Sequence, residues 1–290
     1  MRYHIEHETI LEFEHPVREH HIELRLTPRE DQNQTLHASR IETDPGGEMG
    51  HYCDYYGNRV DYFSVIVPHT HLVTRLIADV EPLRENPFDF TPLPSSEQKE
   101  WYQRQLKEKP ALYDYLLHRS SAVPPIIKLT AAISGVLPGH VPESPVMSSL
   151  LTLMEWIPSV LEYRPGATGV HADLLDAVRT GGGVCQDFAN LFIAVARSWG
   201  IPARYVMGYQ APDLAAAGNE PDVATHAWAE VLVPGGGWIG FDATHNLLAN
   251  DRYIPVAVGR DSYDAAPQRG SFKGDDPGRK PVVNITIGCQ

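Results

Sequence analysis

Cysteine is scarce in this chain of 290 residues, which contains only Cys53, Cys185 and Cys289. An odd and sparse set of thiols does not indicate a disulfide framework, and no CxxC pair is present to bind structural zinc. Free thiols of this kind persist in a reducing compartment. We therefore expect a cytoplasmic protein.

Long apolar runs and an excess of positive charge are also missing. Residues 1–17 carry charges throughout, without the apolar stretch of a signal peptide, and no run approaches the length of a membrane span. The 24 basic and 37 acidic side chains give a net charge of −13. We therefore expect neither nucleic acid nor a membrane as a partner.

Short strand patterns dominate the first part of the chain. Apolar and polar residues alternate over residues 3–26, and Pro16 interrupts the run, so we predict two strands joined near Pro16. Further strands are predicted over residues 35–42, 62–67 and 72–78, with turn signals such as DPGG and YGN between them. This spacing predicts an antiparallel β-sandwich over residues 1–95.

Histidine is abundant in the same region, which raises the question of a metal site. His69 and His71 share a face of a predicted strand, but no third ligand stands at a recognisable spacing. No acidic cluster indicates calcium either. We expect solvated strand histidines, no metal and no cofactor; the residues concerned are His4, His7, His15, His20, His21, His37, His51, His69 and His71.

The remaining chain changes character to mixed helix and strand. Prolines and a predicted helix over residues 101–117 indicate a helical connector spanning residues 96–147. Residues 148–290 are predicted to form an α+β core, with helices over 148–160 and 172–180 and strands over 203–209, 226–233 and 238–242. The polar stretch over residues 212–223 is predicted to be a loop.

The segment GGGVCQDFANLFIAVARSWG, residues 181–200, organises this core. Apolar residues recur at helical spacing after Cys185, and Gly200 with Pro202 ends the pattern. Cys185 therefore lies at a helix N-terminus, where free N–H groups and the helix dipole favour a thiolate. The alternative is a small packing residue, which is the usual role of a free cysteine.

The predicted hairpin brings two further polar residues together. If Leu232 lies opposite Trp238, then His226 and Asp242 are diagonal neighbours on one face of the sheet. A register shifted by one residue would place them on opposite faces.

With that register, the three residues form a set suited to acyl transfer. Cys185 would attack a carbonyl carbon, His226 would move the proton, and Asp242 would orient the imidazole. The Cys185 backbone N–H is one candidate oxyanion donor, and Trp156 and Gln186 are candidates for the second. The alternatives are structural: His226 ends a strand, and Asp242 forms a turn.

Other residues near these motifs are candidates for the substrate cleft. They are Asp187, Tyr209 and Trp228. Asp187 also suits a helix N-terminus as a charge, and Trp228 also suits the core as an aromatic residue.

The stretches GVCQDFA, HAWAEV and GFDAT, taken together, resemble the core of the transglutaminase-like superfamily. The resemblance implies a papain-like fold with Cys185, His226 and Asp242 as a catalytic triad. DYYGNRVDYF and PHTHL resemble the β-sandwich that precedes this core in bacterial members, and the tail from residue 256 resembles theirs. Ala243 replaces a usual proline and His245 a common asparagine.

The resemblance implies a thiol enzyme that acts on peptide or amide bonds of a peptide or protein substrate through a thioester. Hydrolysis, as by a cysteine protease, is the first expectation. Cross-linking by transfer to an amine is the second, because the same thioester serves both. A catalytically inert scaffold and a redox-sensing thiol remain open alternatives.

Overall fold

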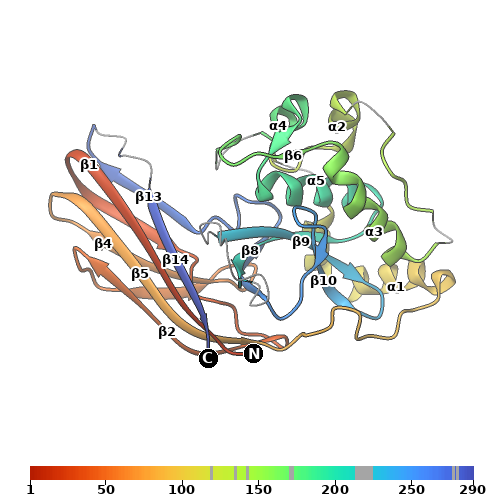
Figure 1. The fold of residues 1–290 in the computed structure, drawn as a ribbon, viewed down its shortest axis with the longest axis horizontal. Coiled ribbons are helices and arrows are strands. Elements are labelled where there is room, and N and C mark those ends of the chain that lie inside the picture. Colours follow the sequence, from red (N-terminus) through yellow and green to blue (C-terminus); the bar gives the residue numbers. More distant parts are fainter. Residues whose placement is uncertain are drawn as a thin grey trace.

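The computed structural model describes residues 1–117, 120–133, 136–141, 144–169, 173–212, 225–275, 278 and 281–290. The chain forms two lobes: a large curled antiparallel sheet, and a group of helices packed around a second sheet (Figure 1). This mixed α/β architecture confirms the predicted combination of an all-β region and an α+β region at that level of detail. The sandwich and papain-like descriptions stay predictions.

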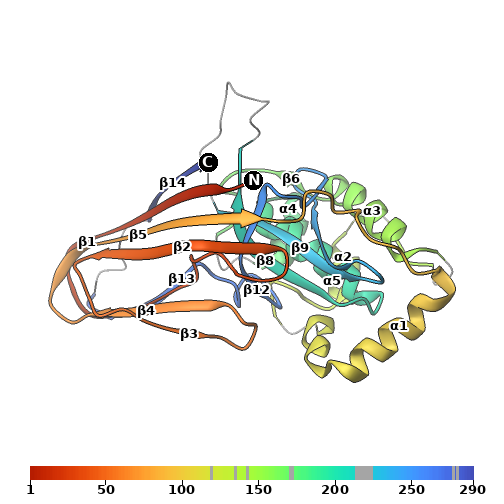
Figure 2. The same cartoon turned by 90° about the horizontal axis from the view of Figure 1, so that it is seen from below.

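The first lobe contains five strands from the N-terminal region, of which β3 was not predicted, and two more from the far end of the chain. Its central order is β2-β5-β1-β4-β3, and β13 and β14 both pair with β1. Figure 2 shows β1, β2 and β5 running side by side along the lobe. The strands are β1 (Tyr3–Leu24), β2 (Gln34–Asp44), β3 (Gly50–Cys53), β4 (Arg59–Val65), β5 (His69–Pro82), β13 (Gln268–Lys273) and β14 (Val282–Cys289).

Strand β1 corrects one prediction. Residues 3–24 form one continuous strand of 22 residues rather than two strands joined near Pro16. The pairing with β5 shifts between Glu12 and Val17, which is where Pro16 lies. A proline has no N–H for the ladder and is tolerated at such an irregularity. Beyond it, β1 changes partners and pairs with β4 and β13.

The C-terminal strands join the two ends of the chain. Tyr3 lies opposite Cys289 in the antiparallel pairing of β1 and β14, so both termini lie together (Figure 1). The predicted core segment, residues 148–290, therefore supplies strands to both sheets.

Helices connect the first lobe to the second. The predicted helix over residues 101–117 is in fact α1 followed by η1, because Pro110 restricts Lys109 to an extended conformation at φ −128° and ψ 76°. The predicted helix over residues 148–160 corresponds to α3 and η2. The elements are α1 (Ser95–Glu108), η1 (Pro110–Leu116), α2 (Ile126–Ala132), α3 (Val146–Trp156), η2 (Ile157–Ser159) and α4 (Leu174–Thr180).

The second lobe is built from α5 (Cys185–Ser198) packed on a five-stranded antiparallel sheet of order β11-β10-β9-β8-β12. Phe192 of α5 stacks on Phe241 of β10 with ring centroids 5.2 Å apart, and both are fully buried. The strands are β8 (Ala203–Gln210), β9 (Thr225–Val233), β10 (Gly237–Asp242), β11 (Leu247–Leu248) and β12 (Tyr253–Gly259). A two-stranded parallel pair, β6 (Glu162–Tyr163) with β7 (Gly182–Gly183), lies before α5.

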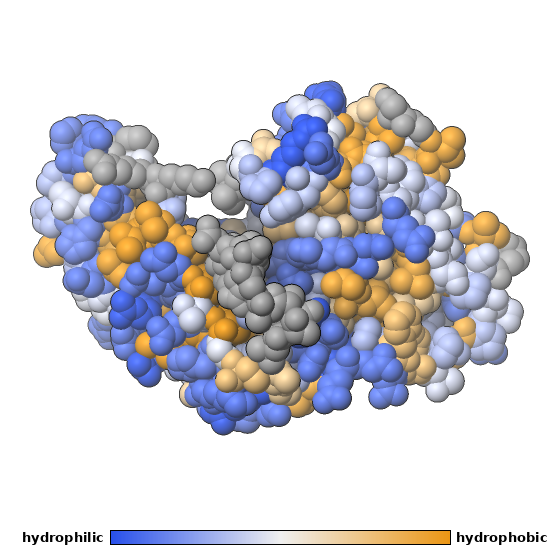
Figure 3. All heavy atoms as spheres, in the orientation of Figure 1, coloured by the Kyte–Doolittle hydropathy of each residue, from blue (hydrophilic) through white to orange (hydrophobic). Residues whose placement is uncertain are grey.

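Two further predictions concern the loop over residues 212–223 and membrane-spanning segments. The loop predicted over residues 212–223 falls almost wholly outside the described residues. Within the described part of the chain, every helix is too short or too polar to span a bilayer. On the face seen in Figure 3, hydrophobic residues form separate patches among hydrophilic ones.

Candidate active site

The start of α5 is shaped by glycine and by Asp187. Gly181 ends α4 in the left-handed conformation (φ +65°), and a Cβ on Gly183 would lie 2.8 Å from Asp187 Oδ2. That space lets the Asp187 carboxylate fold back and accept the Val184 N–H at 2.9 Å and the Thr168 hydroxyl at 2.5 Å. Cys185 follows as the first helical residue, so its N–H has no acceptor within the helix.

Asp187 thus caps the N-terminus of α5, which is one of the two roles considered for it, the other being a residue of the substrate cleft. Its side chain is buried, and burial raises the pKa of its carboxyl while the hydrogen bonds from Thr168 and Val184 oppose that shift. These contacts turn the carboxylate toward the helix N-terminus and the Thr168 segment.

The hairpin has the register that the sequence required. Trp238 lies opposite Leu232, and Phe241 lies opposite Ala229, which confirms the predicted pairing. The His226 ring nitrogen Nε2 consequently lies 2.7 Å from Asp242 Oδ2, at hydrogen-bond distance.

Asp242 is fully buried and heavily hydrogen-bonded. Its Oδ2 atom accepts from His226, from His245 Nδ1 at 2.7 Å and from the Tyr253 hydroxyl at 2.8 Å. Its Oδ1 atom accepts the Thr244 N–H at 3.0 Å. Burial alone would raise the pKa of Asp242, but these hydrogen bonds and the two histidines lower it well below its usual range. The side chain is therefore a carboxylate at neutral pH.

His226 links the carboxylate to the thiol. The side chain is 8% exposed, is hydrogen-bonded to Asp242, and lies close enough to Cys185 for the thiol to influence its pKa. Burial lowers the pKa of His226, but the interactions with Asp242 and Cys185 outweigh burial and raise it well above the ordinary value. The structure therefore brings Cys185, His226 and Asp242 into one site.

Trp228 lies against His226 on the same face of β9. The two rings are nearly parallel, at 27°, with centroids 6.2 Å apart. A Cβ on Gly208 would lie 2.6 Å from the Trp228 ring, and a Cβ on Gly240 would lie 3.2 Å from it. These two glycines on the neighbouring strands thus leave space for the indole.

Three more residues lie around the site: His245, which the sequence analysis noted only as replacing an asparagine, and Tyr253 and Tyr163, which were not predicted. His245 and Tyr253 bond to Asp242, and Tyr163 lies close enough to Cys185 for the thiol to contribute, after burial, to raising the pKa of the tyrosine. His245 stands three residues after Asp242, a spacing that could have indicated it. Tyr253 and Tyr163 are brought in from β12 and β6, and no local pattern points to them.

Two predicted cleft residues have other surroundings. Tyr209 is fully buried, and its hydroxyl lies 2.9 Å from His7 Nδ1 and 3.2 Å from the Leu26 carbonyl, in the first lobe. Trp156 packs on the main hydrophobic core at the end of α3. The described contacts do not join either residue to Cys185. Gln186 is half-buried and directly follows Cys185 as the second residue of α5.

Metal ligands can be assessed in the same way. Among the described residues, one group has suitable spacing: ligand atoms of His226, Asp242 and His245 lie within 4.8 Å of one another. The predicted pair His69 and His71 gains no third ligand there. His69 Nε2 lies 3.3 Å from His20 Nδ1 across the sheet instead. The absence of a metal stays a prediction.

Comparison with known proteins identifies the family. A family model described as the transglutaminase-like superfamily matches residues 140–243, and one described as the bacterial transglutaminase-like N-terminal region matches residues 3–81. An uncharacterized protein of Mycobacterium leprae is 34% identical over 276 residues, covering 94% of each chain. This chain belongs to the transglutaminase-like superfamily.

A partial relative and a solved structure also match. A protein of Pseudomonas aeruginosa named protein-glutamine gamma-glutamyltransferase is 35% identical over 113 residues, which is 37% of this chain and 17% of that protein. A solved structure named "Putative Cysteine Protease" from Cytophaga hutchinsonii matches with a TM-score of 0.74 at 23% identity. It covers 100% of this chain and 91% of that one. This likeness supports the superfamily fold.

Proposed function

We propose that this protein is a thiol enzyme that cleaves peptide or amide bonds through a thioester on Cys185. The observation that carries the proposal is the hydrogen bond between His226 and Asp242, with the Cys185 thiol close enough to His226 to influence its pKa. A buried carboxylate that holds an imidazole beside a thiol is the arrangement that generates a nucleophilic sulfur.

In the first half of the reaction, Cys185 Sγ attacks the carbonyl carbon and a carbon–sulfur bond forms. His226 holds the thiol proton and transfers it to the leaving nitrogen as the carbon–nitrogen bond breaks. In the second half, His226 takes a proton from water, the resulting hydroxide attacks the thioester, and the proton returns to Cys185. The products are an acid and an amine.

Neighbouring groups have distinct tasks in this scheme. Because His226 Nε2 bonds to Asp242, Nδ1 is the ring nitrogen left for the thiol, and Asp242 stabilises the imidazolium that forms. Trp228 supports the imidazole ring from one side. The Cys185 N–H at the helix start donates to the oxyanion, and we propose Gln186 as the second donor, since Trp156 packs on the core.

Cross-linking by transfer to an amine is the second candidate function. The partial match to a protein-glutamine gamma-glutamyltransferase favours it, and only the acceptor of the thioester would differ. In either case the substrate is a peptide or protein. We also propose a reducing, cytoplasmic setting, because Cys53, Cys185 and Cys289 are all free thiols.

The experiment is the rate of iodoacetamide labelling of Cys185 against pH. Cys53 and Cys289 are exposed and would also react, so the measurement uses a Cys53→Ser/Cys289→Ser chain as the parent. The test variant adds His226→Ala, and the matched control adds His140→Ala, a histidine that contacts Trp199 instead. An ordinary free thiol has a pKa of about 8.5. We expect Cys185 to be labelled quickly at pH values well below this.

His226→Ala should abolish this low-pH reactivity, while His140→Ala should leave it unchanged. Identical profiles in the parent and His226→Ala would contradict the proposal and favour an inert scaffold or a simple redox thiol. Mass spectrometry of a glutamine-containing peptide, with and without a primary amine, then separates hydrolysis from transfer.

A further inference from the structure

Strand β14 lies at an edge of the large sheet, and its outer side is open. Its eight residues pair with β1, and within the described part of the chain no other strand pairs with them. Figure 2 shows β14 as the outermost strand, beyond β1 and β5. Six of the eight residues are exposed and the other two are half-buried. An open edge of this kind can accept a further strand through its backbone groups.

The pairing with β1 fixes which backbone groups of β14 face the open side. The Gln290 N–H donates to the Arg2 carbonyl at 2.9 Å, one position beyond the pair formed by Tyr3 and Cys289. Along an antiparallel pair, residues that bond to the partner strand alternate with residues whose N–H and C=O groups point away from it. The residues of β14 that point away are therefore the odd-numbered ones, Val283, Ile285, Ile287 and Cys289.

The sequence of β14 lacks the features that normally protect an open edge. It reads VVNITIGC, with no charged residue and no proline, and five of its eight residues are β-branched. Residues of this type favour strand pairing. Proteins usually protect edges with charges, prolines, bulges or very short strands, because a long uncharged edge is a template for another chain.

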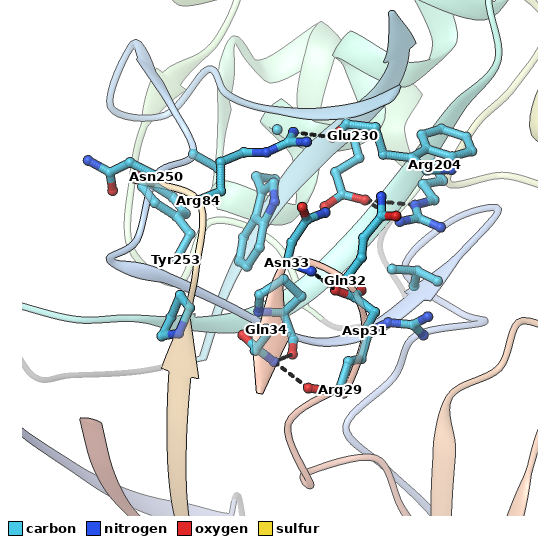
Figure 4. A pocket seen from close by; sticks show the side chains of 17 residues that line it. Arg29, Asp31, Gln32, Asn33, Gln34, Arg84, Arg204, Glu230, Asn250 and Tyr253 are labelled. Carbon is cyan, nitrogen blue, oxygen red and sulfur yellow. Dashed lines mark hydrogen bonds and ion pairs between the residues drawn. The ribbon is translucent and has the colours of Figure 1, made fainter. Parts of the chain in front are cut away.

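The other edges of the same sheet carry such protection. Strand β2 has charged side chains along its length and an irregular register with β5. Its first residue is also fixed in place, since Gln34 Nε2 donates to the Arg29 carbonyl at 2.6 Å (Figure 4) and to the Pro255 carbonyl of the second lobe at 3.0 Å. Strand β3 has only four residues, and β13 carries Arg269 and Lys273. Among the edge strands that the structure describes in this sheet, β14 alone lacks these features.

The sequence of β14 is complementary to itself in the antiparallel direction. With a twofold axis at Ile285, this residue lies opposite the same residue of a second copy, and Val283 lies opposite Ile287. Asn284 then lies opposite Thr286. The apolar pairs fall on the face that packs on the hydrophobic core, and the polar pair falls on the other face. The same register brings the outward backbone groups of the odd-numbered residues into hydrogen-bonded pairs.

The charges beside β14 do not oppose this contact. Two acidic side chains of β1 lie opposite β14, and each has a partner of its own. Glu8 pairs with Arg75 at 2.5 Å, and Glu6 lies 3.5 Å from His4. The contact therefore brings no unpaired charge of either strand against the same charge in a second copy.

We propose that β14 binds a second copy of this chain, with the two β14 strands antiparallel about a twofold axis at Ile285. A twofold contact uses the same edge of both copies and leaves neither edge open, so association ends at a dimer. The contact is one strand wide, so the dimer is weak. The inference goes beyond the proposed function and does not depend on it, because no step requires the thiol.

Sedimentation velocity of the full chain over about 1–300 μM, with a reducing agent present, tests the dimer. We expect a reversible equilibrium between monomer and dimer with a dissociation constant of about 1–100 μM. Thr286→Lys places a lysine at the centre of the contact on an exposed position, and it should weaken the dimer at least about tenfold. Ala38→Lys makes the same change of charge at an exposed position of β2 and should leave the dimer unchanged.

Disulfide trapping tests the register. The parent is a Cys53→Ser/Cys185→Ser/Cys289→Ser chain. Facing Cα atoms of a hydrogen-bonded antiparallel pair are about 5.5 Å apart, a distance that a disulfide spans. Ile285→Cys should therefore give a covalent dimer on mild oxidation. Ile41→Cys is the matched control, since Ile41 is also half-buried against the core but lies on β2, and it should stay monomeric.

Four results would overturn the proposal. A chain that stays monomeric up to about 300 μM has a β14 edge that no second copy covers. A dimer of unchanged strength in a folded Thr286→Lys chain places the interface elsewhere. Equal cross-linking of Ile41→Cys and Ile285→Cys means random collision. Growth beyond the dimer as concentration rises means open-ended association instead of a twofold contact.

Discussion

Two histidine pairs, one in each lobe, behave in opposite ways, and in the second pair His226 is buried while His245 is exposed. In the first lobe, His20 stacks on His69 with ring centroids 5.5 Å apart, and both are nearly fully buried. In the second lobe, His226 lies 5.0 Å from His245 with Asp242 hydrogen-bonded to both. Burial and the neighbouring His69 lower the pKa of His20 to about 4, whereas the pKa of His226 is raised.

The difference is the carboxylate. Burial opposes the imidazolium at both places, but only His226 has an anion at 2.7 Å to stabilise it. A buried histidine without such a partner stays neutral and serves packing. A buried histidine with one is stabilised as an imidazolium and can hold the proton that the proposed thiol chemistry moves.

The largest expected effect comes from removing that anion. Asp242→Asn keeps the shape of the side chain but removes its charge, so the pKa of His226 should fall toward that of His20. We expect Cys185 labelling at pH 6 to fall by about 10³-fold or more, in line with the cost of the same change in a serine triad. Labelling kinetics measure the loss of Cys185 reactivity, and NMR titration of the His226 ring measures the fall in its pKa. A labelling rate close to that of the parent would show that the Asp242 anion is not what distinguishes His226 from His20.

The next prediction concerns stability in acid. Because the pKa of His20 is lowered in the folded state, from 6.5 to about 4, the unfolded chain binds more protons between these values. The contribution of neutral His20 is therefore present above about pH 6.5 and lost as pH falls toward 4, by roughly 3 kcal/mol. His20→Gln should flatten the urea-unfolding profile over this window. His15→Gln on the same strand is the control, and equal pH dependence in both would refute the assignment.

The lowered pKa of Asp242 affects stability only at a lower pH than that of His20 does. Its stabilising contribution is present above the ordinary carboxyl range and lost only as pH falls through its depressed folded value. Between pH 6.5 and 4 the triad carboxylate should therefore contribute a constant amount to stability. Asp242→Asn should lower the free energy of unfolding more at pH 4 than at pH 6.5, because its His226 would then be a buried imidazole with a lowered pKa. A convergence with the parent by pH 4 would contradict that expectation.

The smallest effect is expected at His245. Asp242 retains His226, Tyr253 and a backbone N–H when this hydrogen bond is lost. His245→Asn should therefore reduce labelling at pH 6 only a few-fold, about 1 kcal/mol, the net worth of one hydrogen bond. A loss as large as that of Asp242→Asn would mean that His245, rather than His226, moves the proton.

Much of the site could be predicted because its spacing is local. The helix after Cys185 follows from apolar periodicity within one element. The hairpin follows from its turn residues, and its sequence left two registers open, of which the structure has the one that pairs Leu232 with Trp238 and brings His226 to Asp242.

The sequence by itself therefore determined the helix, the hairpin and the order of the three candidate catalytic residues. Only the tertiary structure decided that Tyr253 bonds to Asp242, that His20 meets His69 and that β14 pairs with β1. It also decided that Tyr209 faces the first lobe, where its hydroxyl meets His7. These contacts join residues far apart in the chain, and their register depends on the packing of whole sheets, which no local periodicity encodes.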